Sequence, residues 1–375
     1  MSLKIATMVR GYVPVPCPSD IIYAPIDLAL RISEGLIDQG HEVTFFAPSG
    51  TRLQVPTETA KLRPLIHDLH EFRELLADTG RMSHNLPGLW DQYMAKVMFE
   101  RAKAGEYDLL HFHHPETALS LAPFYPEVPV TYTMHDPFEA WYREVMEMYI
   151  TPNQHYISIS NNQRSGAPDL PYAETVYNGI DTDLFAFSDA HDGYLLFAGR
   201  IVPEKGVKEA IQVAQMSGQR LLIIGPTYPD HQDYFDHHVK PHLNEKILYL
   251  GLMEREHLIK YYQMAKALLF PIQWEEPFGL SMVEAMACGT PVIALRRGSV
   301  PEVIKHGKTG YVVDSMAEMA AAVGKIEKIR RQDCRQHVEQ SFSVKNMVGG
   351  YAKAFEKILA SRQTTLSKDR EKTHA

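Results

Sequence analysis

Hydrophobic residues in this chain gather in short runs, separated by stretches in which apolar positions recur at helical spacing. Residues 3–9 and 41–47 are two such runs, and residues 26–39 between them have helical spacing and stop at Gly40. Short apolar runs bounded by turn residues are typical of strands in a covered parallel sheet, and glycine commonly ends a helix. The order strand, helix, strand predicts a βαβ unit whose ligand side lies at the carboxyl ends of its strands.

The same alternation returns in the second half of the chain. Strands are predicted at 194–197, 220–225, 247–251 and 267–270, and a helix that ends near Met216 follows the first of them. A chain of 375 residues is too long for one ordinary core. The pattern therefore predicts an α/β protein of two domains, connected near the turn signal Asn178-Gly179.

Composition narrows the class of protein. Hydrophobic residues make up 45% and charged residues 22% of the chain, as in globular proteins in water. The net charge of −8 argues against nucleic acid as a partner, because phosphate binding calls for a basic face. Three distant cysteines argue against a disulfide framework and favour the cytoplasm. We expect no signal peptide and no membrane span, while peripheral membrane contact stays compatible with the sequence.

The stretch from Pro271 to Pro291 is the most informative part of the sequence. It passes from the end of a strand through a turn-rich loop into a helix, and the backbone N–H groups of Phe278, Gly279 and Leu280 are expected at the helix start, where an anion or sugar hydroxyls bind well. Two carboxylates, Glu276 and Glu284, flank this point. Each has an ordinary alternative: Ser281-x-x-Glu284 is also a capping box, and Glu276 also fits a solvated loop face.

Basic and histidine residues follow other predicted strands. Arg200 and Lys205 come after Gly199 and are candidates for neutralising a diphosphate, although ordinary surface positions explain them equally well without further context. His111, His113 and His114 belong to one predicted strand, where hydrogen-bonded packing is favoured over a zinc site. His135 lies at the end of another predicted strand. Its side chain either contacts a ligand or caps the segment that follows.

Two motifs resemble a known family. The patterns Glu276-Pro-Phe-Gly-Leu-x-x-x-Glu284-Ala-Met-Ala-x-Gly289-x-Pro291 and Phe197-Ala-Gly199-Arg200 through Lys205-Gly206 look like the donor-binding signature of the family 4 retaining glycosyltransferases, which have the GT-B fold. The resemblance implies two Rossmann-like parallel-sheet domains facing a central cleft, with a C-terminal helix that crosses back to the first. The expected domains are 1–175, completed by about 343–362, and 176–342, with 363–375 as a disordered tail.

The resemblance also implies a reaction. A hexosyl group would pass from a nucleoside-diphosphate sugar to a hydroxyl acceptor with retention of configuration, without a metal or other cofactor. Arg200 and Lys205 would hold the diphosphate, Glu276 the sugar hydroxyls, Glu284 the ribose and His135 the sugar from the opposite domain, with Gly199 and the backbone of Phe278, Gly279 and Leu280 completing the donor site.

One segment departs from the family pattern. Tyr23-Ala24-Pro25-Ile26-Asp27 replaces Tyr-Gly-Gly-x-Glu; Pro25 suits a helix start, but the approach of this loop to a substrate is in question. A sugar-nucleotide epimerase of the same architecture and a non-catalytic nucleotide-sugar-binding protein are the alternatives. The sequence leaves open the donor base, the sugar, the acceptor and the oligomeric state.

Overall fold

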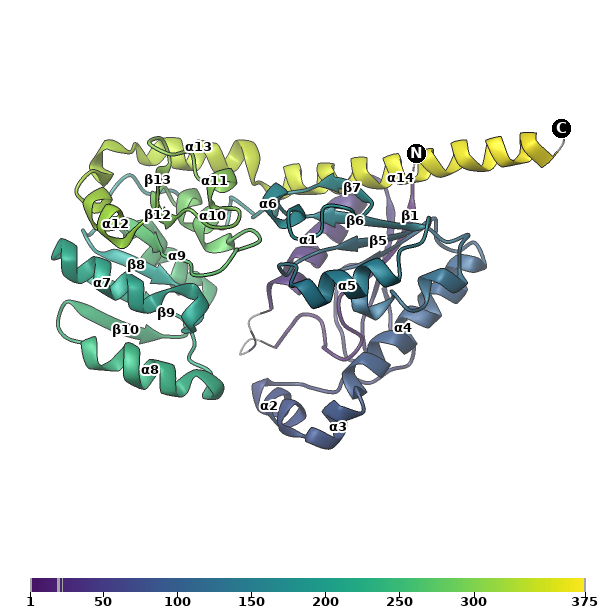
Figure 1. Ribbon diagram of the computed structural model, residues 1–375, viewed down its shortest axis with the longest axis horizontal. Coiled ribbons are helices and arrows are strands. Elements are labelled where there is room, and N and C mark those ends of the chain that lie inside the picture. Colours follow the sequence, from purple (N-terminus) through teal and green to yellow (C-terminus); the bar gives the residue numbers. More distant parts are fainter. Residues whose placement is uncertain (1, 19–20, 22, 374–375) are drawn as a thin grey trace. The chain divides into compact units, whose positions relative to one another are not determined.

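The computed structural model describes residues 2–18, 21 and 23–373, with side chains up to residue 362. The chain forms two compact units (Figure 1). The first comprises Met1–Ile159, Arg164–Tyr177 and the chain from Met347 onward, and the second comprises Ser160–Gln163 and Asn178–Asn346. The short segment Ser160–Gln163 falls in the second unit, whereas the sequence placed the whole of 1–175 in the first.

The first unit is built on a seven-stranded parallel sheet in the order β3-β2-β1-β4-β5-β6-β7. Its strands are β1 (Lys4–Met8), β2 (Glu42–Phe46), β3 (Thr57–Glu58), β4 (Leu109–Phe112), β5 (Val130–Thr133), β6 (Gln154–Ser158) and β7 (Tyr172–Thr175). Its helices are α1 (Ala24–Asp38), α2 (Leu69–Ala77), α3 (Thr79–Ser83), α4 (Leu86–Lys103) and α5 (Ala140–Met148), and α6 (Asn161–Arg164) lies at the boundary of the units.

Both faces of this sheet are covered, which explains its apolar strands. Met98 and Phe99 of α4 pack with Phe112 in one buried cluster. Ile26 of α1 packs with Phe45 in another. As predicted, Pro25 lies in the first turn of α1, so the replaced glycines leave the helix start intact.

The second unit is built on a six-stranded parallel sheet in the order β10-β9-β8-β11-β12-β13. Its strands are β8 (Leu195–Ala198), β9 (Leu221–Ile224), β10 (Ile247–Gly251), β11 (Ala267–Phe270), β12 (Val292–Leu295) and β13 (Gly310–Val313). Its helices are α7 (Val207–Ser217), α8 (Gln232–His238), α9 (Arg255–Met264), α10 (Leu280–Ala287), α11 (Val300–Val303), α12 (Met316–Val323) and α13 (Arg331–Ser341). The prediction of two parallel-sheet, Rossmann-like domains is confirmed.

The last helix, α14 (Val344–Thr373), confirms the predicted return to the first unit and runs along β7 (Figure 1). The Lys357 ammonium donates to the carbonyl oxygen of Ala173 at 2.7 Å. The helix assignment continues through Thr373, and the expected disordered tail stays a prediction. Residues 374–375 lie outside the described residues.

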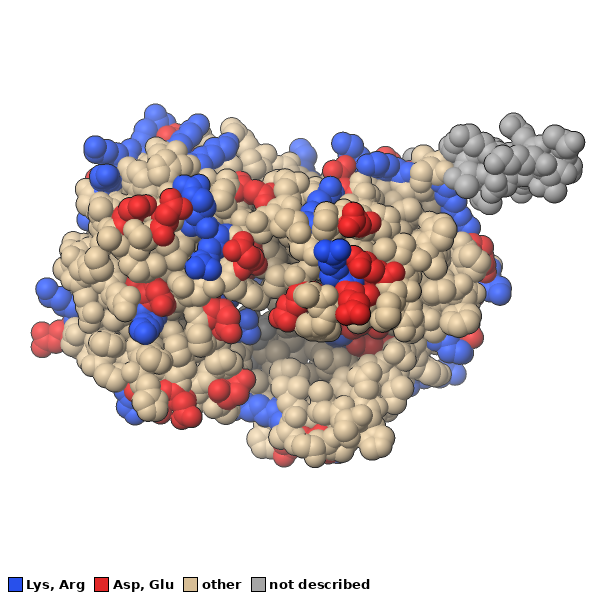
Figure 2. All heavy atoms as spheres, in the orientation of Figure 1, with Lys and Arg blue, Asp and Glu red and all other residues tan. Residues whose placement is uncertain are grey.

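Charged side chains of both signs lie on the surface. Figure 2 shows acidic and basic side chains interspersed over the visible face of each unit, without one continuous basic area. No helix in the described part of the chain combines the length and the hydropathy that crossing a bilayer requires.

Candidate functional site

The loop from β11 to α10 carries two carboxylates, Glu275 and Glu276, after the carboxyl end of a strand of the second unit. Gly279 occupies the N-cap position of α10 with a φ of +80°, a conformation that suits glycine, and the helix begins at Leu280. Within the described residues no side chain caps this helix, and the N–H of Met282 donates to the Gly279 carbonyl, so the N–H groups of Leu280 and Ser281 are left for solvent or a ligand.

The alternative of a capping box at Ser281 is wrong. Ser281 lies inside the first turn rather than at the N-cap, so Glu284 cannot close a box with it. Glu284 instead accepts a hydrogen bond from the hydroxyl of Tyr262 at 3.1 Å. Burial, together with the charge of Glu284, raises the pKa of Tyr262 well above its ordinary value, so the phenol stays a neutral donor.

Lys205 and Glu276 lie in direct contact although they are far apart in sequence. The Lys205 ammonium donates to Oε2 of Glu276 at 2.5 Å, and the indole N–H of Trp274 donates to the same oxygen at 2.9 Å. The ammonium also lies 5.0 Å from the centre of the Trp274 ring. Within the described residues, Oε1 of the buried Glu276 has no hydrogen-bond partner, so it is available to a ligand.

Backbone contacts hold these two loops together. The N–H of Gln273 donates to the carbonyl oxygen of Glu204 at 2.8 Å. Gly206, at the start of α7, approaches so closely that an added Cβ would lie 2.0 Å from the carbonyl oxygen of Pro271. The close approach of the two strand ends therefore places Lys205 beside Glu276.

A third loop, after β12, supports the backbone of Glu276. The N–H of Ser299 donates to the carbonyl oxygen of Glu276 at 2.9 Å, and the N–H of Gly298 donates to Oε2 of Glu275 at 2.7 Å. Ser299-x-x-Glu302 also has the sequence spacing of a capping box, but none forms, because the Ser299 hydroxyl donates to the Phe278 carbonyl instead.

Arg200 lies in the loop that leads from β8 towards Lys205. Its side chain is exposed, and among the described residues it has no side-chain partner. An exposed guanidinium at the carboxyl end of a parallel strand suits an anionic ligand. The structure thus brings Lys205 and Glu276 together, leaves Arg200 exposed in the same loop as Lys205, and places His135 in the first unit.

His135 forms a pair with His113 at the carboxyl ends of β5 and β4. Nδ1 of His113 and Nε2 of His135 are 2.9 Å apart, and the two rings stack at 5.2 Å. The buried Nε2 of His113 has no partner. A buried lone pair without a partner costs less than a buried N–H without one, so the proton fits best on Nδ1 of His113.

This assignment leaves His135 with its own proton on Nδ1. Burial lowers the pKa of His135 to about 3, so the ring is neutral near pH 7. His135 does not cap the next helix, since α5 begins at Ala140 without a side-chain cap. The predicted packing of the strand histidines is confirmed for His111, which is 2.8 Å from the Thr133 hydroxyl.

A charged cluster beside these histidines was missed from the sequence; we call it the Arg10 cluster, comprising Arg10, Tyr23, Asp91, His114, Glu116 and Tyr142. Arg10 donates to Asp91 at 3.0 Å and to Glu116 at 2.7 Å. Burial raises the pKa of Asp91 to about 6, although Arg10 opposes the rise. The only sequence signal was a basic residue directly after the first strand.

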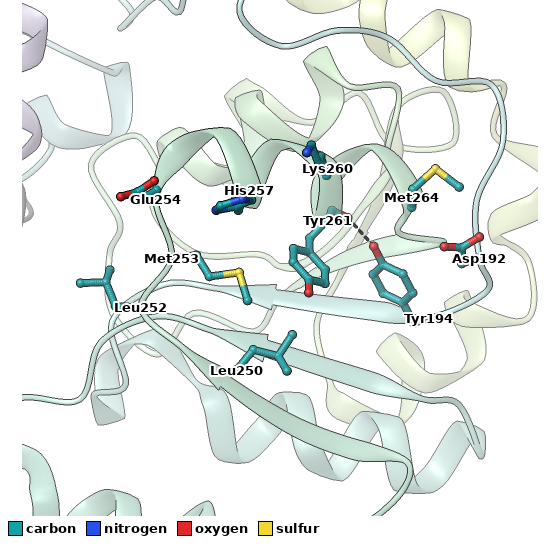
Figure 3. Close-up of a pocket in the computed structure, with 10 residues that line it drawn as sticks. All are labelled: Asp192, Tyr194, Leu250, Leu252, Met253, Glu254, His257, Lys260, Tyr261 and Met264. Atoms are coloured by element: carbon teal, nitrogen blue, oxygen red, sulfur yellow. Dashed lines mark hydrogen bonds between the residues drawn. The ribbon is translucent and has the colours of Figure 1, made fainter.

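A separate groove of about 690 Å³ lies along α9 and the end of β10 (Figure 3). Tyr194, Leu250, Met253 and Tyr261 line it, and the Tyr194 hydroxyl donates to the Tyr261 carbonyl at 2.8 Å. None of the residues predicted to bind a donor is among its lining residues. The lining of this groove is therefore distinct from the predicted donor-binding residues.

Comparison with known families covers most of the chain. The family model described as "Glycosyltransferase Family 4" matches residues 10–184, and the model described as "Glycosyl transferases group 1" matches residues 185–341. The junction of the two matches falls within the segment where the second structural unit begins.

Similar proteins are enzymes named for different acceptors. The N-acetyl-alpha-D-glucosaminyl L-malate synthase of Bacillus anthracis is 24% identical over 88% of this chain and 92% of its own length. The D-inositol 3-phosphate glycosyltransferase of Pseudarthrobacter chlorophenolicus is 26% identical over 76% of each chain. The Anabaena protein HepE, solved with UDP and glucose, has a TM-score of 0.68 at 17% identity, covering 94% of this chain and 99% of its own.

Proposed function

Because the chain belongs to glycosyltransferase family 4, with its GT-B fold, we propose that it transfers a hexosyl group from a nucleoside-diphosphate sugar to a hydroxyl acceptor. The observation that carries the proposal is the convergence of Lys205, Glu276 and the uncapped start of α10 at adjacent strand ends. UDP is our first choice of nucleotide, because HepE was solved with it.

The main electrostatic task in this reaction is to stabilise the departing diphosphate. In our proposal Arg200, Lys205 and the first N–H groups of α10 supply positive charge and donors for it, so no metal is required. Glu276 accepts hydrogen bonds from the sugar hydroxyls through Oε1, Glu284 binds the ribose, and the Nδ1 proton of His135 is donated to the transferred sugar.

We further propose that the anomeric configuration is retained. The acceptor oxygen bonds to the anomeric carbon on the face from which the diphosphate leaves, and the acceptor proton passes to the departing phosphate oxygen. Holding both substrates in place removes most of the entropic cost of their encounter. Cys288 and Cys334 are buried thiols without disulfides, and we place this activity in the cytoplasm.

The test is binding and transfer with a panel of UDP-, GDP- and ADP-sugars, with and without EDTA. A ligand that binds the native state raises its melting temperature. We expect a shift with one nucleotide that EDTA leaves unchanged, and turnover of that sugar-nucleotide to the free diphosphate. A shift that EDTA abolishes would overturn metal independence.

The Lys205→Ala variant tests the site itself. We expect roughly a hundredfold loss of transfer with the fold intact, because a cation beside the leaving group is removed. Lys240→Ala is the matched control, since Lys240 also pairs with a carboxylate, that of Asp236 at 3.1 Å, but its own side chain is exposed. Equal turnover in the two variants would contradict the proposed role of Lys205 in the donor site.

A further inference from the structure

The Arg10 cluster lies where a parallel sheet is expected to bind its ligand. β1 and β4 are neighbours at the centre of the first sheet, and the chain order reverses between them, since β2 and β3 extend to one side and β5 to β7 to the other. Ligands of such sheets bind outside the carboxyl ends of the strands at this switch point. Arg10 follows β1, and His114 and Glu116 follow β4.

Arg10 is the cation that an anionic ligand would be expected to meet at this point, but protein groups already occupy it. Its Nη1 donates to Asp91, its Nη2 to Glu116, and its Nε to the Tyr23 hydroxyl at 3.3 Å. Asp91 is buried and also accepts a hydrogen bond from the N–H of Gly11 at 2.6 Å. Its carboxylate is therefore held both by the Arg10 side chain and by the backbone after β1. Arg10 therefore orders the loop rather than recognising a ligand.

Glu116 is the charged group of the cluster that solvent reaches. Its side chain keeps 42% of its surface exposed while Arg10 holds Oε1 and the Tyr142 hydroxyl donates to Oε2 at 3.0 Å. An ionised carboxylate has about four lone-pair sites, so each oxygen retains capacity for a further donor. Held in this way, Glu116 is a fixed acceptor for hydroxyl groups.

The surrounding charge is negative. Two carboxylates, those of Asp91 and Glu116, pair with the one guanidinium of Arg10. One guanidinium therefore offsets only one of these two negative charges. A phosphate or carboxylate brought to this strand end would be repelled.

We infer that the strand end of β1 and β4 binds an uncharged, hydroxyl-rich acceptor, with Glu116 as the residue that accepts its hydroxyls and excludes anionic acceptors. This inference rests on the proposed function and deepens it by naming the acceptor class. It separates this chain from its two relatives named for malate and for inositol 3-phosphate, both of which are anions.

Matched neutral and anionic compounds test the inference. The probes are myo-inositol against inositol 3-phosphate, and methyl glucoside against methyl glucuronide. Binding to the full chain is followed by saturation-transfer NMR with and without UDP. We expect the neutral member of each pair to bind about tenfold more tightly. Tighter binding of the anionic members, or no binding by any of the four, would overturn the inference.

Two variants tie the preference to one side chain. Glu116→Gln keeps the size and an acceptor oxygen but removes the charge. We therefore expect the affinity for the anionic compounds to rise several-fold, and the difference in affinity between neutral and anionic compounds to become smaller. Glu106→Gln is the control, since Glu106 is similarly exposed and pairs with Arg101 at 2.7 Å, but precedes β4 at the opposite end of the strand. Equal selectivity in the two variants would contradict a role for Glu116.

Failure of this inference can be told apart from failure of the proposed function. The neutral preference is measured by binding alone and needs no turnover. Donor binding is measured separately by the nucleotide panel. An anionic acceptor that is glycosylated would leave the transferase proposal standing and overturn only the acceptor class.

Discussion

Trp274 is a single residue that the motif did not mark, yet it fixes the carboxylate at the centre of the proposed donor site. Its N–H donates to Oε2 of Glu276 at 2.9 Å, and its ring lies beside the Lys205 ammonium. We expect Trp274→Phe to weaken binding of UDP-sugar about fivefold, because one hydrogen bond contributes about 1 kcal/mol net and the ring is retained. Isothermal titration with the donor measures this change.

The chain offers a matched control for this substitution. Trp141 in α5 also donates its N–H to a carboxylate, Glu139, at 2.7 Å, but its side chain is exposed in the first unit. Trp141→Phe should leave the donor affinity unchanged. If Trp274→Phe also bound the donor as tightly as the unmodified chain, its N–H would have no part in orienting Glu276.

Packing between elements explains why the loop after β12 matters to the site. Gly298 has a φ of +55°, and an added Cβ would lie 2.3 Å from the carbonyl oxygen of Glu276. We expect Gly298→Ala to displace this backbone, to lower stability by about 2 kcal/mol or more, and to weaken donor binding. Denaturant unfolding and the nucleotide panel measure the two effects.

Gly307→Ala separates backbone strain from displacement. Gly307 has a φ of +76°, and an added Cβ would meet no atom within 4 Å. Its substitution should cost only the left-handed conformation, about 1 kcal/mol, and leave donor binding intact. Equal losses of donor affinity in both variants would mean that Gly298 acts through general stability and not through Glu276.

The elements also show what the sequence alone can predict. Apolar strands such as β1, β9 and β11 were predicted, because a strand that is covered on both faces consists largely of apolar residues. The two-residue β3 and the edge strand β7 were not, because edges need few apolar residues. Both capping boxes failed because a tertiary contact, Ser299 to Phe278, and a glycine N-cap at Gly279 replaced the local pattern.

The candidate site also has one part that the sequence predicted and one part that it did not. The contiguous motif around Glu276 predicted which residues of the second unit would lie near one another. The Arg10 cluster joins residues from several distant segments, among them Arg10, Asp91 and Glu116, whose meeting is set by sheet order. No local spacing encodes such a contact, and it follows only once β1 and β4 are known to be neighbours.

At the scale of the whole molecule, the buried histidines make stability depend on pH. Burial lowers the pKa of His111 and of His135 to about 3, and holds that of His113 and His114 well below the ordinary value. The unfolded chain binds these protons near pH 6.5, so the stabilisation is complete above that pH and is lost as the pH falls towards the folded value.

From pH 7.5 to 5.5, each such histidine should therefore lower the free energy of unfolding by about 1.4 kcal/mol. We expect His111→Gln to flatten the pH dependence by about that amount in denaturant unfolding, whatever its effect at pH 7.5. His70→Gln is the control, because His70 is exposed on α2. Parallel pH profiles for His111→Gln and the unmodified chain would show that His111 binds its proton as readily in the folded chain as in the unfolded one, because the contribution of Asp91, whose pKa is raised, is present in both profiles and cancels.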